Sequence, residues 1–535
     1  MDPAIGWLAV IGRKSFLFVI LALGCQPDCT PPPGPVRPNV VLVTVDTLRA
    51  DHLGCYGNPT VLTPSLDALA RDGVLFERCY AQSHITLPSH LTILSSLPLA
   101  DHGVLTNEDT ANAAIEVLPR LFARAGYRAA AFVSARHLGP RGGLGPVMTD
   151  LEVHEAPPRG SQPFAAGETN RRLFRWLRGA CRDPVFVWVH YFDPHMPYTP
   201  PPPFDRAYYE GDPFDPHETS MDGVVLNWYF HELDGVRPRL ASRPDLVRPL
   251  KRELGVNSRT VRELVLHPDR LAAHLDGNQA DPQLRSRLQE LATVARRGLP
   301  YRRHLADWLT GVRDLRFPLA QYAGEVSYVD QEIGRLRSEL ERLGLAERTI
   351  LVLTADHGEG LGEHGIYFNH YGLHEPMLRV PLIVWAPGRV VPARRPQVAR
   401  GLDVAPTVLR LAGLTVPASM QGRDLFAPVG ADEPFVAEAI RAEQLMVLEG
   451  RWKLIRTFRS FHYVDAFARE AGATELYDLT EDPGELVNVV ERYPDVAGAL
   501  STRLDAWLRA HPTRTSAGAP PSERLRSLRA LGYVE

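Results

Sequence analysis

The sequence predicts an α/β fold with a doubly wound, mainly parallel sheet flanked by helices. Its longest apolar runs are rich in β-branched residues, which is typical of strands buried on both faces of a parallel sheet. These runs are 39–45, 185–190 and 349–354, with shorter ones at 129–133 and 380–385. Helical apolar patterns lie between the runs, at 63–71, 114–125 and 331–343. Strands that alternate with helices in this way favour helices on both faces of the sheet.

The composition is that of an ordinary globular protein. Of the 535 residues, 44% are apolar and 23% are charged, which excludes a disordered chain and a membrane protein with many spans. The formal net charge is −4, so we expect no nucleic-acid partner. The only lysines are Lys14, Lys251 and Lys453. A mechanism that needs an active-site lysine therefore has few candidates.

The N-terminus predicts an export signal. Arg13 and Lys14 precede an apolar run over 15–24 that ends at Cys25, and this run is too short for a stable membrane span. A small residue followed by cysteine resembles a bacterial lipoprotein signal, so we expect lipidation of Cys25 and membrane attachment through that anchor. The Pro-rich segment 26–37 predicts a stiff tether. A plain signal peptide or an N-terminal anchor is the alternative; in each case the protein is predicted to be exported, as a periplasmic or outer-membrane-attached protein.

Acidic and histidine side chains follow three of the predicted strands. Asp46 follows the first strand, and Asp356 and His357 follow the third. The second strand ends at His190, with Asp193 and His195 just beyond. Each residue alone could be a helix cap or a turn former. Because ligands bind at the carboxyl ends of parallel strands, the three together predict a site for Zn, Mn, Mg or Ca.

An ordered set of motifs resembles the sulfatase family of the alkaline-phosphatase superfamily, over most of residues 38–510. The blocks are 43–57, 86–90, 190–197, 354–359, 361–365, 379–383, 403–409, 422–425, 475–479 and 482–488. The resemblance implies an alkaline-phosphatase-like α/β fold and a hydrolase of sulfuric or phosphoric esters. It is much less specific for the substrate than for the fold.

The nucleophile motif departs from the family pattern. Sulfatases have Cys or Ser followed by x-Pro-Ser-Arg, and the first residue is oxidised to formylglycine. The matching segment here is Thr86-Leu-Pro-Ser-His90, so formylglycine is not expected. Thr86 resembles instead the nucleophile of relatives that transfer phosphoryl groups. A metal that lowers the pKa of the hydroxyl would activate it; an inactive homologue is the alternative.

The remaining site residues are implied by the same resemblance. One divalent metal ion is expected on Asp46, Thr86, Asp356 and His357. His195 matches a histidine that contacts the transferred group or protonates the leaving oxygen. The other candidate substrate or transition-state contacts are His90, His137 and His370, and His370 stands where sulfatases keep a lysine.

The chain divides into a catalytic domain over 38–424, an antiparallel subdomain over 425–510 and a tail over 511–535. Residues 205–320 are expected to form a helical insertion or lid. Within the domain we predict a metal-dependent ester hydrolase acting on a small-molecule or glycan ester. Two alternatives stay open: a transferase that passes the group to a glycan or lipid alcohol, and an inactive binding lipoprotein.

Overall fold

The computed structural model describes residues 37–149, 151–155, 163–224, 308–428, 434–439, 443–464 and 467–511, and the single residue 286. The predicted signal peptide, Cys25, almost all of the tether, most of the insertion and nearly all of the tail lie outside the described residues. No helix among the described residues is long and apolar enough to cross a membrane.

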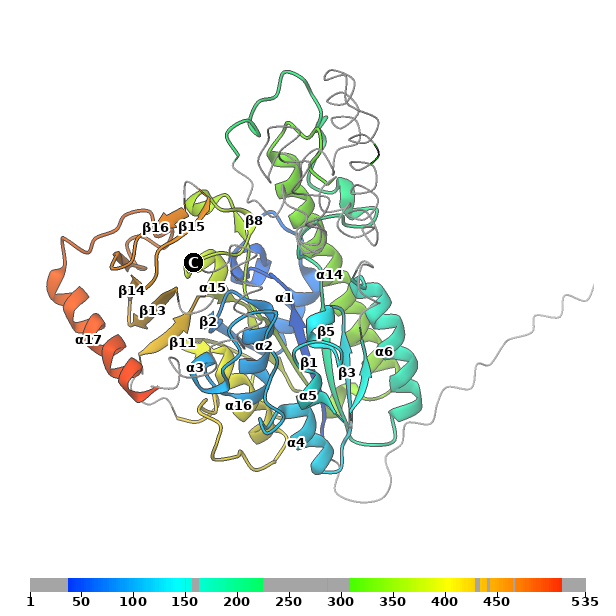
Figure 1. Ribbon diagram of the computed structural model, residues 1–535. Helices are drawn as coiled ribbons and strands as arrows, with labels where there is room; N and C mark the ends of the chain where they lie inside the picture. Colours follow the sequence, from blue (N-terminus) through cyan, green and yellow to red (C-terminus); the bar gives the residue numbers. More distant parts are fainter. Residues whose placement is uncertain are drawn as a thin grey trace, which may run out of the picture.

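A nine-stranded sheet forms the centre of the described catalytic domain (Figure 1). The strand order is β11-β2-β10-β6-β1-β5-β3-β4, and β9 pairs with β2. Only β9 and β10 run antiparallel to their neighbours in this sheet. The strands are β1 Asn39–Val45, β2 Val74–Tyr80, β3 Arg128–Val133, β4 Glu152–His154, β5 Val185–Tyr191, β6 Thr349–Ala355, β9 Arg379–Val380, β10 Leu382–Trp385 and β11 Ala393–Arg400. The predicted mainly parallel sheet is confirmed.

Helices cover both faces of this sheet (Figure 1). On one side α14 packs against α1 and α6, and on the other α2 packs against α4 and α16. The helices are α1 Pro64–Arg71, α2 Thr86–Ser95, α3 Leu99–His102, α4 Leu118–Arg124, α5 Gly145–Met148, α6 Ala166–Ala180, α14 Arg316–Arg342, α15 Glu375–Leu378, α16 Val404–Leu411 and α17 Pro494–Ala510. α4 begins later than the predicted 114–125, with Pro119 in its first turn, where proline is favoured. α14 begins at Arg316, so the predicted insertion boundary at 320 falls inside a helix.

The C-terminal subdomain contains a second, antiparallel sheet in the order β12-β13-β14-β17. Leu500 and Leu504 of α17 pack against its apolar face. A separate hairpin, β15 with β16, lies beside it. The strands are β12 Phe435–Glu438, β13 Gln444–Glu449, β14 Trp452–Thr457, β15 Phe461–Val464, β16 Phe467–Arg469 and β17 Thr474–Asp478. The predicted antiparallel subdomain is confirmed.

A buried lysine joins the two parts. Lys453 of β14 is fully buried, and its Nζ lies 2.8 Å from Glu485 Oε1 and 3.1 Å from Glu375 Oε1. Burial opposes the charge on Lys453, but the two carboxylates outweigh burial and raise its pKa. Glu485 also accepts the backbone N–H of Glu375 at the start of α15. The C-terminal subdomain therefore holds α15 of the catalytic domain.

α15 in turn supports the loop that follows β6. The N–H groups of Gly358 and Glu359 donate to the carbonyl oxygens of Met377 and Pro376, at 2.8 and 3.1 Å. A Cβ on Gly358 would overlap the Pro376 carbonyl oxygen, so only glycine fits at this approach. The loop after β6 is thus fixed from the side of the C-terminal subdomain.

We expect Lys453→Met to lower the free energy of unfolding by about 3–5 kcal/mol, because it leaves two buried carboxylates without their cation. Urea denaturation measures this loss. The control is Arg451→Met, which removes a half-exposed partner of Asp478 and should cost less than about 1 kcal/mol. Equal losses of unfolding free energy in the two variants would contradict the role of Lys453 in neutralising Glu485 and Glu375.

The buried side chain of His102 should make the folded protein less stable in acid. Its Nδ1 accepts the Val104 N–H at 3.1 Å, its Nε2 lies 3.0 Å from Thr92 Oγ1, and burial lowers its pKa to about 3. In the unfolded chain this ring has a pKa near 6.5. The contribution of the neutral ring to the free energy of unfolding is therefore fully present above pH 6.5 and is lost as pH falls toward 3.

Between pH 7 and pH 5 this one ring should account for about 2 kcal/mol of lost stability. His102→Gln should remove that part of the pH dependence, measured by urea denaturation in the presence of a chelator. The exposed His462 provides the control His462→Gln, for which we expect the wild-type slope. An unchanged slope in His102→Gln would contradict the prediction.

Candidate metal centre and active site

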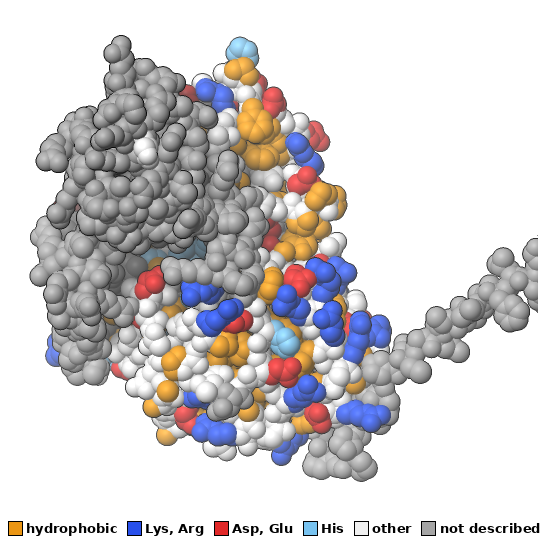
Figure 2. Space-filling model, turned by 45° about the vertical axis from the view of Figure 1, so that its right-hand side comes forward, with side chains coloured by type: hydrophobic (Ala, Val, Ile, Leu, Met, Phe, Trp, Pro, Cys, Tyr) orange, Lys and Arg blue, Asp and Glu red, His pale blue; other side chains and the backbone are white. Residues whose placement is uncertain are grey.

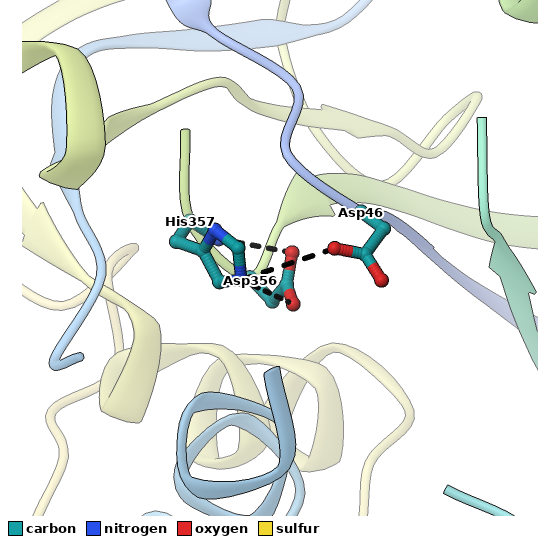
Figure 3. Close-up of side chains that lie close together, drawn as sticks. All are labelled: Asp46, Asp356 and His357. Atoms are coloured by element: carbon teal, nitrogen blue, oxygen red, sulfur yellow. Dashed lines mark hydrogen bonds and ion pairs between the residues drawn. The ribbon is translucent and has the colours of Figure 1, made fainter. Parts of the chain in front are cut away.

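Two carboxylates and an imidazole converge at the carboxyl ends of β1 and β6 (Figure 3). In the parallel pairing of these strands Val45 lies opposite Ala355, so Asp46 and Asp356 leave the sheet at the same level. His357 Nε2 lies 3.4 Å from Asp356 Oδ2 and 3.8 Å from Asp46 Oδ1. All three side chains are fully buried. Among the described residues, these three form the one group of acidic, cysteine or histidine side chains compact enough to hold a metal ion.

Three of the four oxygens of the two carboxylates lack a hydrogen-bond partner among the described residues. Within the described structure, both oxygens of Asp46 and Oδ2 of Asp356 have no hydrogen-bond partner. Burial raises the pKa of Asp46 to about 6, and burial together with Asp46 raises the pKa of Asp356 well above its usual range. Buried acceptors of this kind are stabilised by a cation. The residues present therefore fit a divalent metal ion with oxygen and nitrogen ligands.

Hydrogen bonds set His357 in the form that a metal requires. Its Nδ1 lies 2.9 Å from the Gly358 carbonyl oxygen. A carbonyl oxygen only accepts, so Nδ1 carries the proton and Nε2 presents its lone pair toward the carboxylates. A ligand histidine that donates its other N–H to a carbonyl is the usual arrangement in metal sites.

Thr86 completes the predicted ligand set. It is the first residue of α2, it is buried, and its Oγ1 lies 3.3 Å from His357 Nε2. Ser89, one turn later, donates to the Asp356 carbonyl oxygen at 2.6 Å and ties α2 to the loop after β6. The structure thus brings together Thr86 and the three other predicted ligands.

His90 lies behind the metal ligands. It is fully buried in α2, its Nδ1 lies 2.8 Å from the Thr86 carbonyl oxygen and 3.4 Å from Asp356 Oδ2, and its Nε2 lies 3.0 Å from Thr44 Oγ1. Both ring nitrogens therefore face protein groups. Sequence reasoning predicted that His90 stabilises transition-state charge, whereas this geometry places it against the ligands themselves.

His195 and His370 lie beside His357. The His370 ring centroid is 4.2 Å from that of His357 and 5.9 Å from that of His195. His370 Nδ1 donates to the His84 carbonyl oxygen at 2.6 Å, and His195 Nδ1 donates to that of Met196 at 2.7 Å. Burial, with His195 and His84 nearby, lowers the pKa of His370 well below its usual range. The neutral imidazole is therefore the resting form of His370.

The third predicted substrate contact, His137, belongs to the same group of imidazoles. Burial, with His190 and His195 nearby, lowers its pKa to about 3, and its Nε2 has no hydrogen-bond partner in the described structure. His84 was not named from sequence, and His190 was named only as the end of the second predicted strand. His190 is the next-to-last residue of β5, and its Nε2 is 3.5 Å from Asp46 Oδ2. Its position at the end of a strand that pairs with β1 is the signal that could have given it a specific role.

The site is poor in permanent positive charge. No described Arg or Lys is among the groups that most strongly shift the pKa values of Asp46, Asp356, His357 and His370. The nearby Arg49 forms ion pairs with Asp51 at 2.7 Å and Glu363 at 2.8 Å. Imidazoles whose pKa values are lowered by burial, among them His90, His190 and His370, lie around the candidate metal centre instead.

Comparison with known proteins decides the family. The model of the Sulfatase family matches residues 38–414.

This chain belongs to the sulfatase family.

A second model, for the C-terminal region of N-sulphoglucosamine sulphohydrolase, matches residues 362–510 of this sulfatase-family chain. An N-acetylglucosamine-6-O-sulfatase of Bacteroides thetaiotaomicron is 26% identical over 486 residues, which cover 85% of this chain and 82% of the relative. An arylsulfatase of Clostridium perfringens is 23% identical and covers 85% of this chain and 90% of its own length.

Solved structures share the fold. A protein solved with its substrate D-glucosamine-2-N,6-O-disulfate superposes with a TM-score of 0.61 at 19% identity, covering 91% of this chain and all of that one. The phosphonate monoester hydrolase of Agrobacterium radiobacter gives 0.60 at 21% identity, covering 89% and 96%. This member of the sulfatase family is accordingly an ester hydrolase with a sulfatase and alkaline-phosphatase-like fold.

We expect Asp46→Asn to weaken divalent-metal binding by at least about 100-fold, because it removes a charged ligand rather than a group behind one. Calorimetric titration of metal-stripped protein with Mn²⁺ or Zn²⁺ measures the affinity. Asp183→Asn, at an exposed carboxylate after α6, is the control and should bind as the wild type does. Wild-type affinity in Asp46→Asn would remove Asp46 from the ligand set.

Proposed function

We propose that this protein is an exported, metal-dependent hydrolase of a singly charged sulfuric or phosphoric ester, with Thr86 as the nucleophile. The observation that carries the proposal is the position of Thr86 Oγ1, 3.3 Å from His357 Nε2 beside two uncompensated buried carboxylates. A divalent metal ion on Asp46, Asp356 and His357 would lower the pKa of the Thr86 hydroxyl and neutralise charge on the reacting group.

The placement of Thr86 favours its ionised form in a second way. It is the first residue of the ten-residue helix α2, and negative charge is stabilised at the N-terminus of a helix. The hydroxyl loses its proton to solvent, and Oγ1 then attacks the central sulfur or phosphorus atom. A bond from Oγ1 to that atom forms while the bond to the leaving oxygen breaks.

His195 is proposed to protonate the leaving oxygen. Its Nδ1–H donates to the Met196 carbonyl oxygen at 2.7 Å, so the ring acts as an acid in its imidazolium form, which gives its Nε2 proton to the leaving oxygen and becomes neutral. After transfer, the neutral Nε2 takes a proton from water, and the hydroxide releases the group from Thr86 Oγ1. His370 and His137 are proposed to contact the oxygens of the transferred group.

The charge of the site supports a singly charged ester. Among the described residues, imidazoles rather than permanently charged Arg or Lys side chains surround the candidate metal centre, so a doubly charged phosphate monoester would receive little stabilisation there. Sulfate monoesters, phosphate diesters and phosphonate monoesters carry one negative charge. A glycan ester as the natural substrate is supported by the relative named N-acetylglucosamine-6-O-sulfatase and by the similar structure solved with its substrate D-glucosamine-2-N,6-O-disulfate.

Export and membrane attachment through Cys25 are part of the proposal. They are supported by the basic residues and the apolar run that precede Cys25, and by the Pro-rich segment that follows it. Over the described part of the face in Figure 2, Arg side chains are interspersed with Asp and Glu.

We expect Thr86→Ala to lower kcat by roughly 10³-fold or more, because it removes the attacking oxygen. Thr86→Ser, which retains a hydroxyl, should stay within about 100-fold of the wild type. The assay compares nitrophenyl esters of sulfate, of phosphate as monoester and diester, and of a phosphonate, with Mn²⁺, Zn²⁺ or Ca²⁺ supplied. The intact mass should show an unmodified Thr86.

The singly charged esters should be turned over at least about tenfold faster than the phosphate monoester. Preference for the monoester would contradict the charge argument, and full activity of Thr86→Ala would contradict the nucleophile. If none of the esters reacts while the metal binds, the inactive binding protein becomes the better interpretation.

A further inference from the structure

A chain of buried polar side chains runs behind the candidate metal centre. The indole Nε1–H of Trp188 in β5 donates to Thr44 Oγ1 in β1 at 2.9 Å, and the same hydroxyl lies 3.0 Å from His90 Nε2. All three side chains are fully buried. Thr44 precedes the ligand Asp46 by two residues, so it lies on the same face of β1.

The direction of these hydrogen bonds follows from a carbonyl group. His90 Nδ1 lies 2.8 Å from the Thr86 carbonyl oxygen, which can only accept, so Nδ1 carries the proton. In the neutral ring Nε2 is then an acceptor. Thr44 therefore donates its hydroxyl proton to Nε2 while it accepts the indole proton. In the opposite tautomer the Nδ1 lone pair would face the carbonyl oxygen, which repels it.

The proton on Nδ1 faces two parts of the site at once. One is the backbone of Thr86, and the other is Asp356 Oδ2, 3.4 Å away. The ring thus donates to the residue of the proposed nucleophile and lies within electrostatic range of a carboxylate of the proposed metal centre. Groups behind a ligand that orient it in this way alter metal affinity as well as activity.

We propose that Thr44 is a positioning residue, whose hydroxyl donates to Nε2 of the Nδ1–H tautomer of His90 and thereby holds the ring that orients Asp356 and Thr86 toward the metal. This inference rests on the metal site of the proposed function. Neither Thr44 nor Trp188 belongs to the ligand set, and His90 acts through the groups it touches rather than on the substrate.

The other carboxylate has a matching arrangement, which supports the proposal independently. The Ser134 N–H donates to His190 Nδ1 at 3.3 Å, so the neutral ring carries its proton on Nε2. That nitrogen lies 3.5 Å from Asp46 Oδ2. Each carboxylate therefore faces the N–H of one buried imidazole, and in each ring a donor on the other nitrogen fixes the tautomer.

The first measurement is the tautomer of His90 in the wild-type protein. Long-range ¹H–¹⁵N NMR of histidine-labelled protein distinguishes a protonated Nδ1 from a protonated Nε2, and His90→Gln assigns the signal by its loss. We expect the proton on Nδ1. A proton on Nε2 would overturn the proposal without reference to any variant.

The second measurement is metal affinity in three variants. Thr44→Val is close in shape but has no hydroxyl, so it should weaken Mn²⁺ or Zn²⁺ binding about 10–100-fold and change the His90 signal. Thr44→Ser should restore both. Trp188→Phe leaves the Thr44 hydroxyl free to donate to His90, so we expect the wild-type tautomer and an affinity within about threefold of wild type.

The outcomes separate positioning from packing. Wild-type affinity in Thr44→Val would overturn the proposal, as would an equal loss in Trp188→Phe, which would indicate that packing matters rather than the hydroxyl. Thermal unfolding checks that each variant is folded. If a variant does not fold, the tautomer of His90 in the wild-type protein still tests the proposal. No ester is used in these experiments, so the role of Thr44 can be tested even if no ester is hydrolysed. Conversely, the proposed hydrolase activity can be correct even if the predicted His90 tautomer is wrong.

Discussion

The constraint on which this structure depends is the burial of two carboxylates that the surrounding described residues do not neutralise. Asp46 and Asp356 leave adjacent parallel strands at the same level, so the sheet itself forces two negative charges together. Such a pair is unfavourable without a cation. α2, His357 and the imidazoles behind the pair all surround this site, whose residues fit a metal ion.

Backbone carbonyl groups determine how the histidines of the site can act. In His357, His370 and His195 the Nδ1–H donates a hydrogen bond to a backbone carbonyl oxygen. In the neutral ring, Nε2 then carries the lone pair, on the side of the ring away from that carbonyl group. The ring of His357 faces the carboxylates, and the other two rings can accept or return a proton. His90 is bound in the same way but has its Nε2 occupied by Thr44. Identical side chains therefore acquire different roles from the backbone around them.

The sequence predicted the parallel sheet, the antiparallel subdomain and the convergence of Asp46, Thr86, Asp356 and His357, because strand ends and family motifs are local features. It did not predict that His90 faces the ligands, because that depends on the tertiary contact between α2 and Thr44. For a related reason the sequence placed His190 at the end of a strand but assigned it no specific role. Only the pairing of β5 with β1 places it beside Asp46.

The contact of Lys453 with Glu485 and Glu375 bears on how such proteins diversify. The antiparallel subdomain is connected through α15 to the loop that carries His357, so it is not an interchangeable module. Recombination between relatives at the apparent domain border near residue 425 would separate Lys453 from the Glu375 it evolved with. The matched C-terminal family region begins at residue 362, upstream of α15. This region includes both Lys453 and its partners Glu375 and Glu485. The matched C-terminal region thus begins inside the catalytic domain rather than at the visible boundary between the sheets.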